Sequence, residues 1–266
     1  MSFLQADFSA VEARITCWVS GQEDALEEYR QGVDRYKRMA SFVYGVAEKD
    51  ISKHPQRFVG KQCILGCGYG MGPAKFRVTC KKMGNYDLPM GVEDRAVKAF
   101  RAKHKKVVDF WYAMESAAKC AIIRKNTLVT VGKVVYCHKD IEGMPFLFMK
   151  LPSGRRLSYP RPRISGDRIT FFGNTVGTQW GDVSTWGGTL VENLVQGIAA
   201  DLMVHGSRKC EEAGYEIATL IHDECICYYK PGQTVEELVR LLTDLPEWAT
   251  GLPLEAEGDL IPFYKK

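Results

Sequence analysis

The first part of the chain alternates between a short apolar run and helical patterns. Residues 3–8 predict a short strand, which runs directly into a helix starting near Ser9. Ser9 and Glu12 have the S-x-x-E spacing of a capping box, in which two side chains bond backbone N–H groups of the first turn. A second helix is expected from about Pro55 to Tyr69, because proline suits a first helical turn.

The middle of the chain changes from a helical to a strand pattern. From Val92 to Ile123 the apolar residues recur at helical spacing, which predicts one long helix. From Leu128 to Gly177 the sequence is rich in β-branched and aromatic residues with Gly and Pro turns, which predicts strands and loops. The apolar residues of the helical pattern are Val97, Phe100, Val107, Trp111, Met114 and Ala118.

The last part of the chain predicts an amphipathic helix and a hairpin. Two apolar runs, residues 217–221 and 225–229, flank the sequence His222, Asp223 and Glu224, which places acidic residues at or beside a tight turn. Strands at both ends with helices between them predict an α+β protein whose termini share one sheet. The apolar side of the helix comprises Leu190, Val191, Leu194, Val195, Ile198, Leu202 and Met203.

The amino-acid composition excludes few classes of protein. The chain has 266 residues, enough for one large or two small domains, and a net charge of +4, which permits a polyanionic partner without requiring one. Basic residues cluster at 81–82, 103–106, 155–156 and 161–163, although such clusters are most often solvated faces. The 9 cysteines have no zinc-site spacing, and no signal peptide or membrane span is visible, so a reduced cytoplasmic protein is expected.

Three acidic residues form the first candidate site. Asp7 ends the first strand, and Asp223 and Glu224 lie at the hairpin turn. Carboxylates are costly to bring together unless a cation neutralises them, and clustered aspartates suit Mg²⁺. Two such ions, about 3.5–4 Å apart, would activate a 3′-hydroxyl and stabilise a departing pyrophosphate. Taken singly, each aspartate is better explained as an ordinary strand-end or turn residue.

A helix with residues at steps of four forms the second candidate site. Arg57, Lys61, Leu65 and Tyr69 would lie along one face, which suits a nucleoside triphosphate with its phosphates on the cations and its base near the ring. The same helix contains three glycines, at 60, 66 and 68, each costing about 1 kcal/mol relative to alanine. We expect a backbone or a ligand to approach closely there. Ordinary packing against neighbouring helices is the alternative.

Two polar residues of the late helix form a third, weaker candidate. Glu192 and Gln196 are four residues apart on its polar side. Exposure to solvent is the default for such a pair. Gln196 could instead contact the minor-groove acceptors of a base pair, which are nearly independent of sequence.

Four segments resemble, in order, the motifs of the family A DNA polymerases, the DNA polymerase I class. Residues 7–14 resemble motif A, and residues 57–70 resemble motif B with the spacing R-x3-K-x3-L-x3-YG. Residues 195–201 (VQGIAAD) resemble the family's QGTAAD helix, and residues 222–224 (HDE) resemble motif C. The segments 36–40, 151–155 and 251–254 resemble phage members of the family more than the bacterial repair enzyme.

The resemblance implies metal-binding and nucleotide-binding roles. Asp7 and Asp223 would bind two Mg²⁺ ions, for which Mn²⁺ could substitute, and the Phe8 carbonyl would be a further ligand. Glu224 would assist near the primer terminus. The residues that would hold the incoming nucleotide are Arg57, Lys61, Leu65, Tyr69, Glu12 and Tyr36, with Lys61 also protonating the leaving group, Tyr69 stacking at the insertion site and Glu12 excluding a ribose 2′-hydroxyl. Gln196, His222, Glu192 and Arg14 would contact DNA at the primer-terminal region or support the site.

Three positions depart from the family pattern. Leu65 stands where the family usually has Phe or Tyr, at a position tied to sugar discrimination. Tyr36 replaces a histidine that contacts the phosphates in the bacterial form. Glu192 replaces an asparagine that faces the minor groove.

The resemblance also predicts which parts of a polymerase the chain contains. It implies a right-hand palm, an antiparallel sheet with helices, at residues 1–35 and 186–266. Mostly helical fingers would occupy residues 36–185, with a β-rich insertion at about 128–177. Family members have an exonuclease-like domain and a thumb before motif A, whereas motif A begins here at residue 7, so we expect both domains to be absent.

These features predict a templated DNA polymerase that takes primer-template DNA and dNTPs. We expect the catalytic half of a split enzyme or a minimal phage form, with a separate polypeptide supplying a thumb or an exonuclease. It would act in the bacterial host cytoplasm if a phage encodes it.

Two alternatives stay open. A single-subunit RNA polymerase shares the palm, but Glu12 would block a ribonucleotide, and Glu224 in the His-Asp-Glu run also argues against it. A non-catalytic DNA-binding accessory protein derived from a polymerase would not need Asp7, Asp223, Arg57, Lys61 and Tyr69 together. Metal-dependent nucleotide incorporation discriminates between an enzyme and such a protein.

Overall fold

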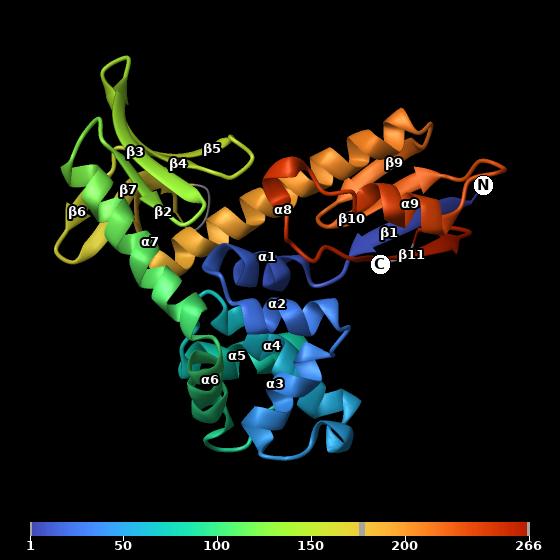
Figure 1. The fold of residues 1–266 in the computed structure, drawn as a ribbon. Helices are drawn as coiled ribbons and strands as arrows, with labels where there is room; N and C mark the ends of the chain where they lie inside the picture. The colour runs from blue at the N-terminus through green and yellow to red at the C-terminus, as the bar shows by residue number, and fades with distance from the viewer. Residues whose placement is uncertain (1, 176–178, 265–266) are drawn as a thin grey trace. The chain divides into compact units, whose positions relative to one another are not determined.

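The computed structural model describes residues 2–175 and 179–264, and the chain divides into two compact units (Figure 1). One unit comprises residues 1–15 and 195–266, and the other comprises residues 16–194. The two divisions fall inside helices α1 (Val11–Ser20) and α8 (Gly187–Glu212). The palm and fingers boundaries expected near residues 35 and 186 stay predictions.

A four-stranded antiparallel sheet organises the first unit, in the order β11-β1-β10-β9 (Figure 1). The strands are β1 (Phe3–Phe8), β9 (Glu216–Ile221), β10 (Glu224–Tyr228) and β11 (Ala256–Ile261). The first and last strands of the chain are hydrogen-bonded neighbours, which confirms that the termini share one sheet. The strand at residues 3–8 and the hairpin around His222 and Asp223 are also as predicted.

One face of this sheet is covered by helix α9 (Val235–Leu242). Leu4, Ala6 and Phe8 are buried on that face, since alternate residues of a strand share a side. Gly258, which pairs with Ala6, lies under α9: a Cβ atom there would be 2.8 Å from Val235 Cγ1. The glycine therefore lets the helix approach the sheet, and Asp7 is left exposed on the opposite face.

The helical part of the second unit follows the predicted pattern with three corrections. The first helix begins at Val11, and Ala10 (φ 52°), whose carbonyl accepts the Arg14 N–H, precedes it. Ser9 is therefore not the residue that immediately precedes the helix, and the capping box stays a prediction. The helices of this part are α2 (Glu23–Arg30), α3 (Arg35–Tyr44), α4 (Phe58–Cys67), α5 (Pro73–Gly84), α6 (Val92–Lys103) and α7 (Lys105–Ile123).

Two predicted helices have different bounds. The helix expected over 55–69 is α4 alone, preceded by a π-helical turn at Lys53–Arg57 and followed by a turn that contains Tyr69. The long helix expected over 92–123 is interrupted at His104 (φ −114°, ψ 52°). The six apolar residues of the predicted pattern are nevertheless all buried, two on α6 and four on α7.

The β-rich insertion comprises two antiparallel sheets, ordered β2-β3-β4-β5 and β6-β7-β8. The prediction of strands from 128 onward is confirmed, although its end at Gly177 lies outside the described residues. The pattern continues through β8 before α8 begins. The strands are β2 (Leu128–Val131), β3 (Val134–Ile141), β4 (Met144–Lys150), β5 (Arg156–Pro160), β6 (Arg163–Ser165), β7 (Arg168–Asn174) and β8 (Trp180–Thr185).

The late amphipathic helix is confirmed as α8, with all seven predicted apolar residues buried. The nine cysteines are all unpaired thiols, and eight of them are buried, so they pack as small apolar side chains. Within the described part of the chain, no helix has both the length and the apolar character required to cross a membrane.

Candidate active site

The three acidic residues of the first candidate site meet at one end of the first unit's sheet. Asp7 on β1 lies directly opposite Glu224 on β10 in the antiparallel register. Directly opposite residues have Cβ atoms about 4.5–5.5 Å apart. The Phe8 N–H donates to the Asp223 carbonyl at 2.9 Å, which fastens the end of β1 to the hairpin turn. The pairing of β1 with β10 thus brings together carboxylates that are more than 200 residues apart in the sequence.

Each of the three carboxylates has a different exposure. Asp7 is exposed, Asp223 is half-buried and Glu224 is 5% exposed. The Tyr264 hydroxyl donates to Glu224 Oε2 at 3.1 Å, so the buried carboxylate has a hydrogen-bond donor. Partial burial and this bond to Glu224 raise the pKa of Tyr264, which keeps the hydroxyl protonated as a donor.

The sheet adds a fourth carboxylate that the sequence did not reveal. Glu257 on β11 is opposite Asp7 on the side away from Glu224, so the three acids form a row across three adjacent strands. Like charges in direct opposition are destabilising in a sheet. A cation bound beside this row would therefore reduce the repulsion between the carboxylates.

Arg14 anchors the start of α1 next to this site. Its guanidinium donates to the carbonyls of Ser9 (2.8 Å) and Pro253 (2.7 Å) and to the carboxylate of Glu255 (2.5 Å). The side chain is 5% exposed, so these bonds tie motif A to the C-terminal segment. This arrangement supports the expected role in holding the site, and a direct contact with DNA stays a prediction.

The donor set at this end of the sheet fits Mg²⁺. Carboxylate and carbonyl oxygens are hard ligands, and Mg²⁺ is commonly held by one or two carboxylates together with substrate phosphates and water. Among the described residues no group of three or more His, Cys, Asp or Glu side chains is arranged to hold a metal ion. Asp7 and Asp223, with the Phe8 carbonyl, would thus provide part of the coordination and the substrate would complete it.

The second candidate site lies in the other unit, where Arg57 immediately precedes α4. Its Nε donates to Asp34 Oδ2 at 2.7 Å, and its guanidinium lies 5.2 Å from the centre of the Tyr36 ring. Arg57 and Asp34 are both half-buried. The position of Arg57 is therefore set by two residues at the start of α3, one of which, Tyr36, was a predicted nucleotide-binding residue.

The remaining residues of the helix lie on its more exposed side. Lys61 is exposed and Leu65 half-buried, whereas Val59 and Cys63 face the interior. Tyr69 is half-buried in the turn after α4, so it does not continue the helical row as predicted. A positively charged helix start and an aromatic ring beyond the helix end are nonetheless retained.

The prediction of close approach at the glycines of this helix is confirmed at Gly60. A Cβ atom there would lie 2.0 Å from the carbonyl oxygen of Tyr36 and 3.1 Å from the Ala40 side chain. No side chain larger than hydrogen fits between α3 and α4 at this point. The contact also fixes Tyr36 with respect to the helix that carries Lys61.

The residues expected near DNA are distributed over α8, the hairpin turn and α1. Gln196 is exposed and Glu192 half-buried, one helical turn apart on α8. His222 is exposed in the hairpin turn with φ 57°. Glu12 is half-buried in the first turn of α1. Their contacts with nucleic acid stay predictions.

Three residues of these sites were missed by the sequence reasoning: Asp34, Glu257 and Tyr264. A carboxylate immediately before the first turn of a helix is a capping signal, and Asp34 does accept the Lys37 N–H at 3.0 Å. Nothing local in the sequence pairs Glu257 with Asp7 or Tyr264 with Glu224.

Comparison with known proteins identifies the family. The sequence profile of DNA polymerase family A matches residues 1–135, half of the chain. The chain belongs to DNA polymerase family A. The matched residues include the segments that resemble motifs A and B, residues 7–14 and 57–70. The segments 195–201 and 222–224 lie beyond the match.

Relatives of this family A chain include phage and bacterial polymerases. The DNA polymerase of Bacillus phage SP02 is 34% identical over 273 residues, covering 99% of this chain and 41% of the phage protein. DNA polymerase I of Chloroflexus aurantiacus is 35% identical over 69 residues, 26% of this chain and 7% of that protein. The chain thus spans less than half the length of these relatives.

A solved family A structure shares the fold. The POL domain of Pol1 from M. smegmatis, in a complex with DNA primer-template and dNTP, matches with a TM-score of 0.60 at 16% identity. The match covers 98% of this chain and 39% of that one. The α+β fold with antiparallel sheets and helices is therefore that of a polymerase domain.

Proposed function

We propose that this family A chain catalyses DNA-templated DNA synthesis, adding nucleotides from dNTPs to a primer 3′-hydroxyl. The observation that supports this most is the convergence of Asp7, Asp223 and Glu224 through the register of β1 with the β9–β10 hairpin. The structural relative was solved with primer-template and dNTP, and the phage relative is named a DNA polymerase.

The reaction divides between the two candidate sites. The primer 3′-oxygen forms a bond to the α-phosphorus of the dNTP while the bond from that phosphorus to the leaving pyrophosphate breaks. Asp7 and Asp223 would hold the metal ions, and Glu224 would assist at the primer terminus. When bound, Mg²⁺ lowers the pKa of the attacking hydroxyl and neutralises charge on the leaving oxygen.

The helix α4 supplies the cationic groups for the triphosphate. Asp34 accepts a hydrogen bond from Arg57 Nε and so orients the guanidinium. The two Nη atoms of Arg57 would bind the phosphate oxygens. Lys61 binds the phosphates as a point charge and donates the proton that the pyrophosphate takes up. Tyr69 stacks at the insertion site, and Glu12 excludes a ribose 2′-hydroxyl.

The palm would comprise residues 1–35 and 186–266, and the mostly helical fingers would comprise residues 36–185 with the β-rich insertion. We propose that the upstream duplex is gripped by a thumb outside these 266 residues. Phosphate contacts dominate the affinity for duplex DNA, so these residues alone should bind primer-template weakly at physiological salt.

Primer extension with Mg²⁺ and all four dNTPs tests the proposal. Wild type should extend a labelled primer, and Asp223→Ala should reduce the rate by at least about 10³-fold. Glu236→Ala, which removes an exposed carboxylate at the start of α9, is the matched control and should retain activity. If neither wild type nor control extends the primer, the region of the phage SP02 polymerase outside the matched 41% is added in trans. Persistent inactivity with that region bound would overturn the enzymatic proposal.

A further inference from the structure

The sheet β2-β3-β4-β5 has two unlike faces. One face packs on α7: Tyr136, Leu147 and Met149 are fully buried, and the Tyr136 hydroxyl contacts Met114 Sδ at 3.9 Å. The other face is more exposed: its edge residue Leu128 is 70% exposed, although Cys137 on the same face is buried. We call this second face the outer face, and its residues follow from the strand register: Leu128, Thr130, Val135, Cys137, Lys139, Ile141, Met144, Phe146, Phe148, Lys150, Arg156, Ser158 and Pro160.

Two aromatic rings lie next to one another on the outer face, with cations on the same and neighbouring strands. Phe146 and Phe148 are half-buried, and their rings are stacked with centroids 5.7 Å apart and an interplanar angle of 22°. Lys139 is directly opposite Phe146 on the neighbouring strand, and Lys150 is opposite Arg156. The Arg156 guanidinium lies 5.3 Å from the centre of the Phe148 ring.

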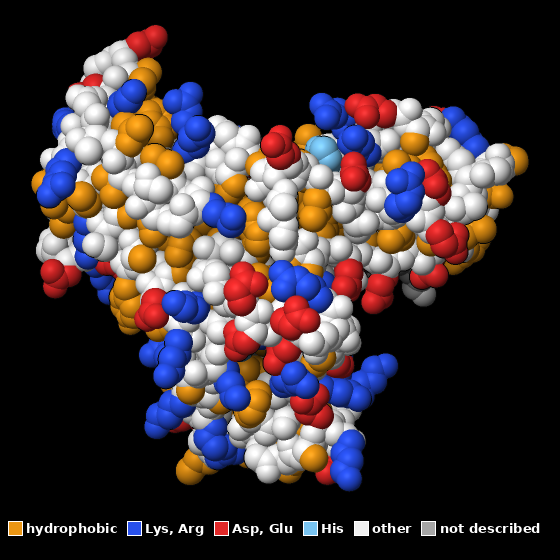
Figure 2. Space-filling model, in the orientation of Figure 1, with side chains coloured by type: hydrophobic (Ala, Val, Ile, Leu, Met, Phe, Trp, Pro, Cys, Tyr) orange, Lys and Arg blue, Asp and Glu red, His pale blue; other side chains and the backbone are white. Residues whose placement is uncertain are grey.

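The charge on the outer face has one sign. The thirteen positions of this face include Lys139, Lys150 and Arg156 and no carboxylate. Asp140 belongs to the opposite face by strand alternation and pairs with Lys125 at 3.7 Å. In Figure 2 the surface over β3, β4 and β5 shows hydrophobic side chains bordered by Lys and Arg side chains.

This combination matches one class of ligand. Aromatic rings on a sheet face stack with unpaired bases, and cations beside them bind the phosphates of the same strand. A duplex is a poorer ligand, because its bases are stacked on one another and cannot reach the rings. We propose that the outer face is a binding surface for single-stranded DNA, with bases on Phe146 and Phe148 and phosphates on Lys139, Lys150 and Arg156.

Binding to a fluorescein-labelled dT oligonucleotide, followed by anisotropy without dNTPs, tests this surface independently of polymerase activity. Phe148→Ala should weaken binding about tenfold, and Phe148→Tyr, which retains a ring, should bind like wild type. Lys150→Ala should weaken binding and reduce the slope of log K against log salt by about 0.7. Lys125→Ala is the matched control, since it removes the same charge from the opposite side of the same sheet.

Thermal melting of each variant separates loss of binding from loss of folding. Because Lys139 and Lys150 are exposed, the double variant Lys139→Ala/Lys150→Ala should melt like wild type and bind the oligonucleotide more weakly. Equal affinity of this variant and wild type would overturn the proposal. So would an equal loss of affinity for a blunt duplex, because it would show a general phosphate-binding patch rather than a single-strand surface.

Discussion

The carboxylate of Asp34 bonds two partners with its two oxygens: Oδ2 accepts from Arg57 Nε at 2.7 Å, and Oδ1 accepts from the Lys37 N–H at 3.0 Å. One side chain therefore caps α3 and fixes the arginine at the start of α4. Burial acts to raise the pKa of Asp34, but the bonds from Arg57 and the Lys37 backbone lower it overall. The carboxylate is consequently ionised throughout the neutral range and available to orient Arg57.

Asp34→Asn should weaken dNTP binding while leaving the helix cap in place. The amide oxygen can still accept from Lys37, but the charged bond that orients Arg57 is lost. Because both side chains of the pair are about one-third exposed, the effect should be limited to about 1 kcal/mol, or roughly a fivefold rise in KM, with kcat little changed. Steady-state incorporation kinetics measure this, with Asp50→Asn as control. A lower KM would show instead that Asp34 competes with the phosphates.

Glu12→Ala should increase the use of ribonucleotides. A bulky side chain at this position would exclude the 2′-hydroxyl, so removing it should lower the preference for dNTP over rNTP by about tenfold or more, equivalent to about 1.4 kcal/mol. Single-nucleotide incorporation with each substrate gives the ratio of kcat/KM values. Glu12→Gln keeps the size of the side chain and should retain most of the preference. A large loss in that variant would point to charge rather than to bulk.

Gly60→Ala should destabilise the helical part of the second unit. The added methyl would meet the Tyr36 carbonyl oxygen at 2.0 Å, so α3 and α4 would have to separate. Overpacking of this kind costs about 1–3 kcal/mol, measured as the free energy of unfolding in urea. Gly72→Ala is the control, because Gly72 has φ −88° and no atom within 4 Å of the added methyl. Similar losses at both positions would contradict the packing explanation.

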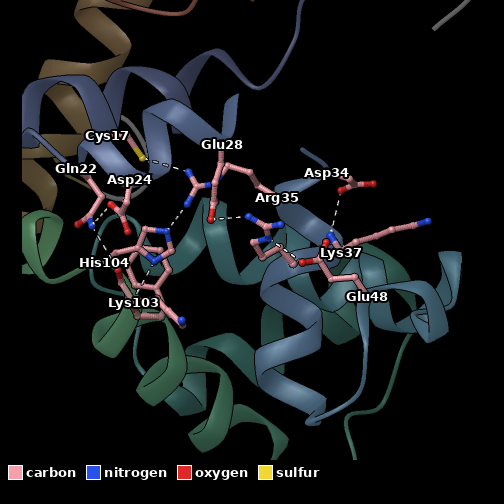
Figure 3. Close-up of polar contacts among 12 residues, drawn as sticks. Cys17, Gln22, Asp24, Glu28, Asp34, Arg35, Lys37, Glu48, Lys103 and His104 are labelled. Atoms are coloured by element: carbon pink, nitrogen blue, oxygen red, sulfur yellow. Dashed lines mark hydrogen bonds and ion pairs between the residues drawn. The ribbon is translucent and has the colours of Figure 1, made fainter. Parts of the chain in front are cut away.

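His104 should make the protein sensitive to mild acid. The ring stacks on Phe100 at 4.3 Å, and its Nε2 lies 2.7 Å from Arg35 Nη2 within the polar cluster in Figure 3. Burial, and then the charge of Arg35, lower the pKa of His104 to about 4. The other charged groups of this cluster include Asp24, Glu28, Lys103 and Arg38, which donates to Glu28 at 2.9 Å.

The direction of the acid effect follows from this lowered pKa. The unfolded state takes up a proton near pH 6.5, whereas the native state does so only near pH 4, so stability falls as the pH decreases between these values. The expected loss attributable to His104 is on the order of 2 kcal/mol between pH 7 and pH 5. Urea unfolding at several pH values measures it. His104→Gln should flatten the profile over this range, and an unchanged profile would show that other groups cause the acid sensitivity.

The sequence by itself determined the local elements and the chemical inventory. The strand at 3–8, the hairpin at Asp223 and the buried side of α8 follow from the spacing of apolar residues. These patterns depend on neighbours within a few residues, which a single sequence displays directly. The motif residues also identified the family, and the three glycines correctly indicated a close approach, at Gly60.

Only the tertiary structure decided how distant segments meet. The helix over 92–123 is interrupted at His104, whose ring stacks on Phe100 and whose Nε2 lies 2.7 Å from Arg35 of another helix. The row of Glu257, Asp7 and Glu224 follows from strand register, which no local pattern specifies. Burial of polar groups and the pairing of strands depend on contacts between residues far apart in the chain. For this reason the sequence indicated the candidate carboxylates Asp7, Asp223 and Glu224, and only the fold showed that Glu257 lies beside them.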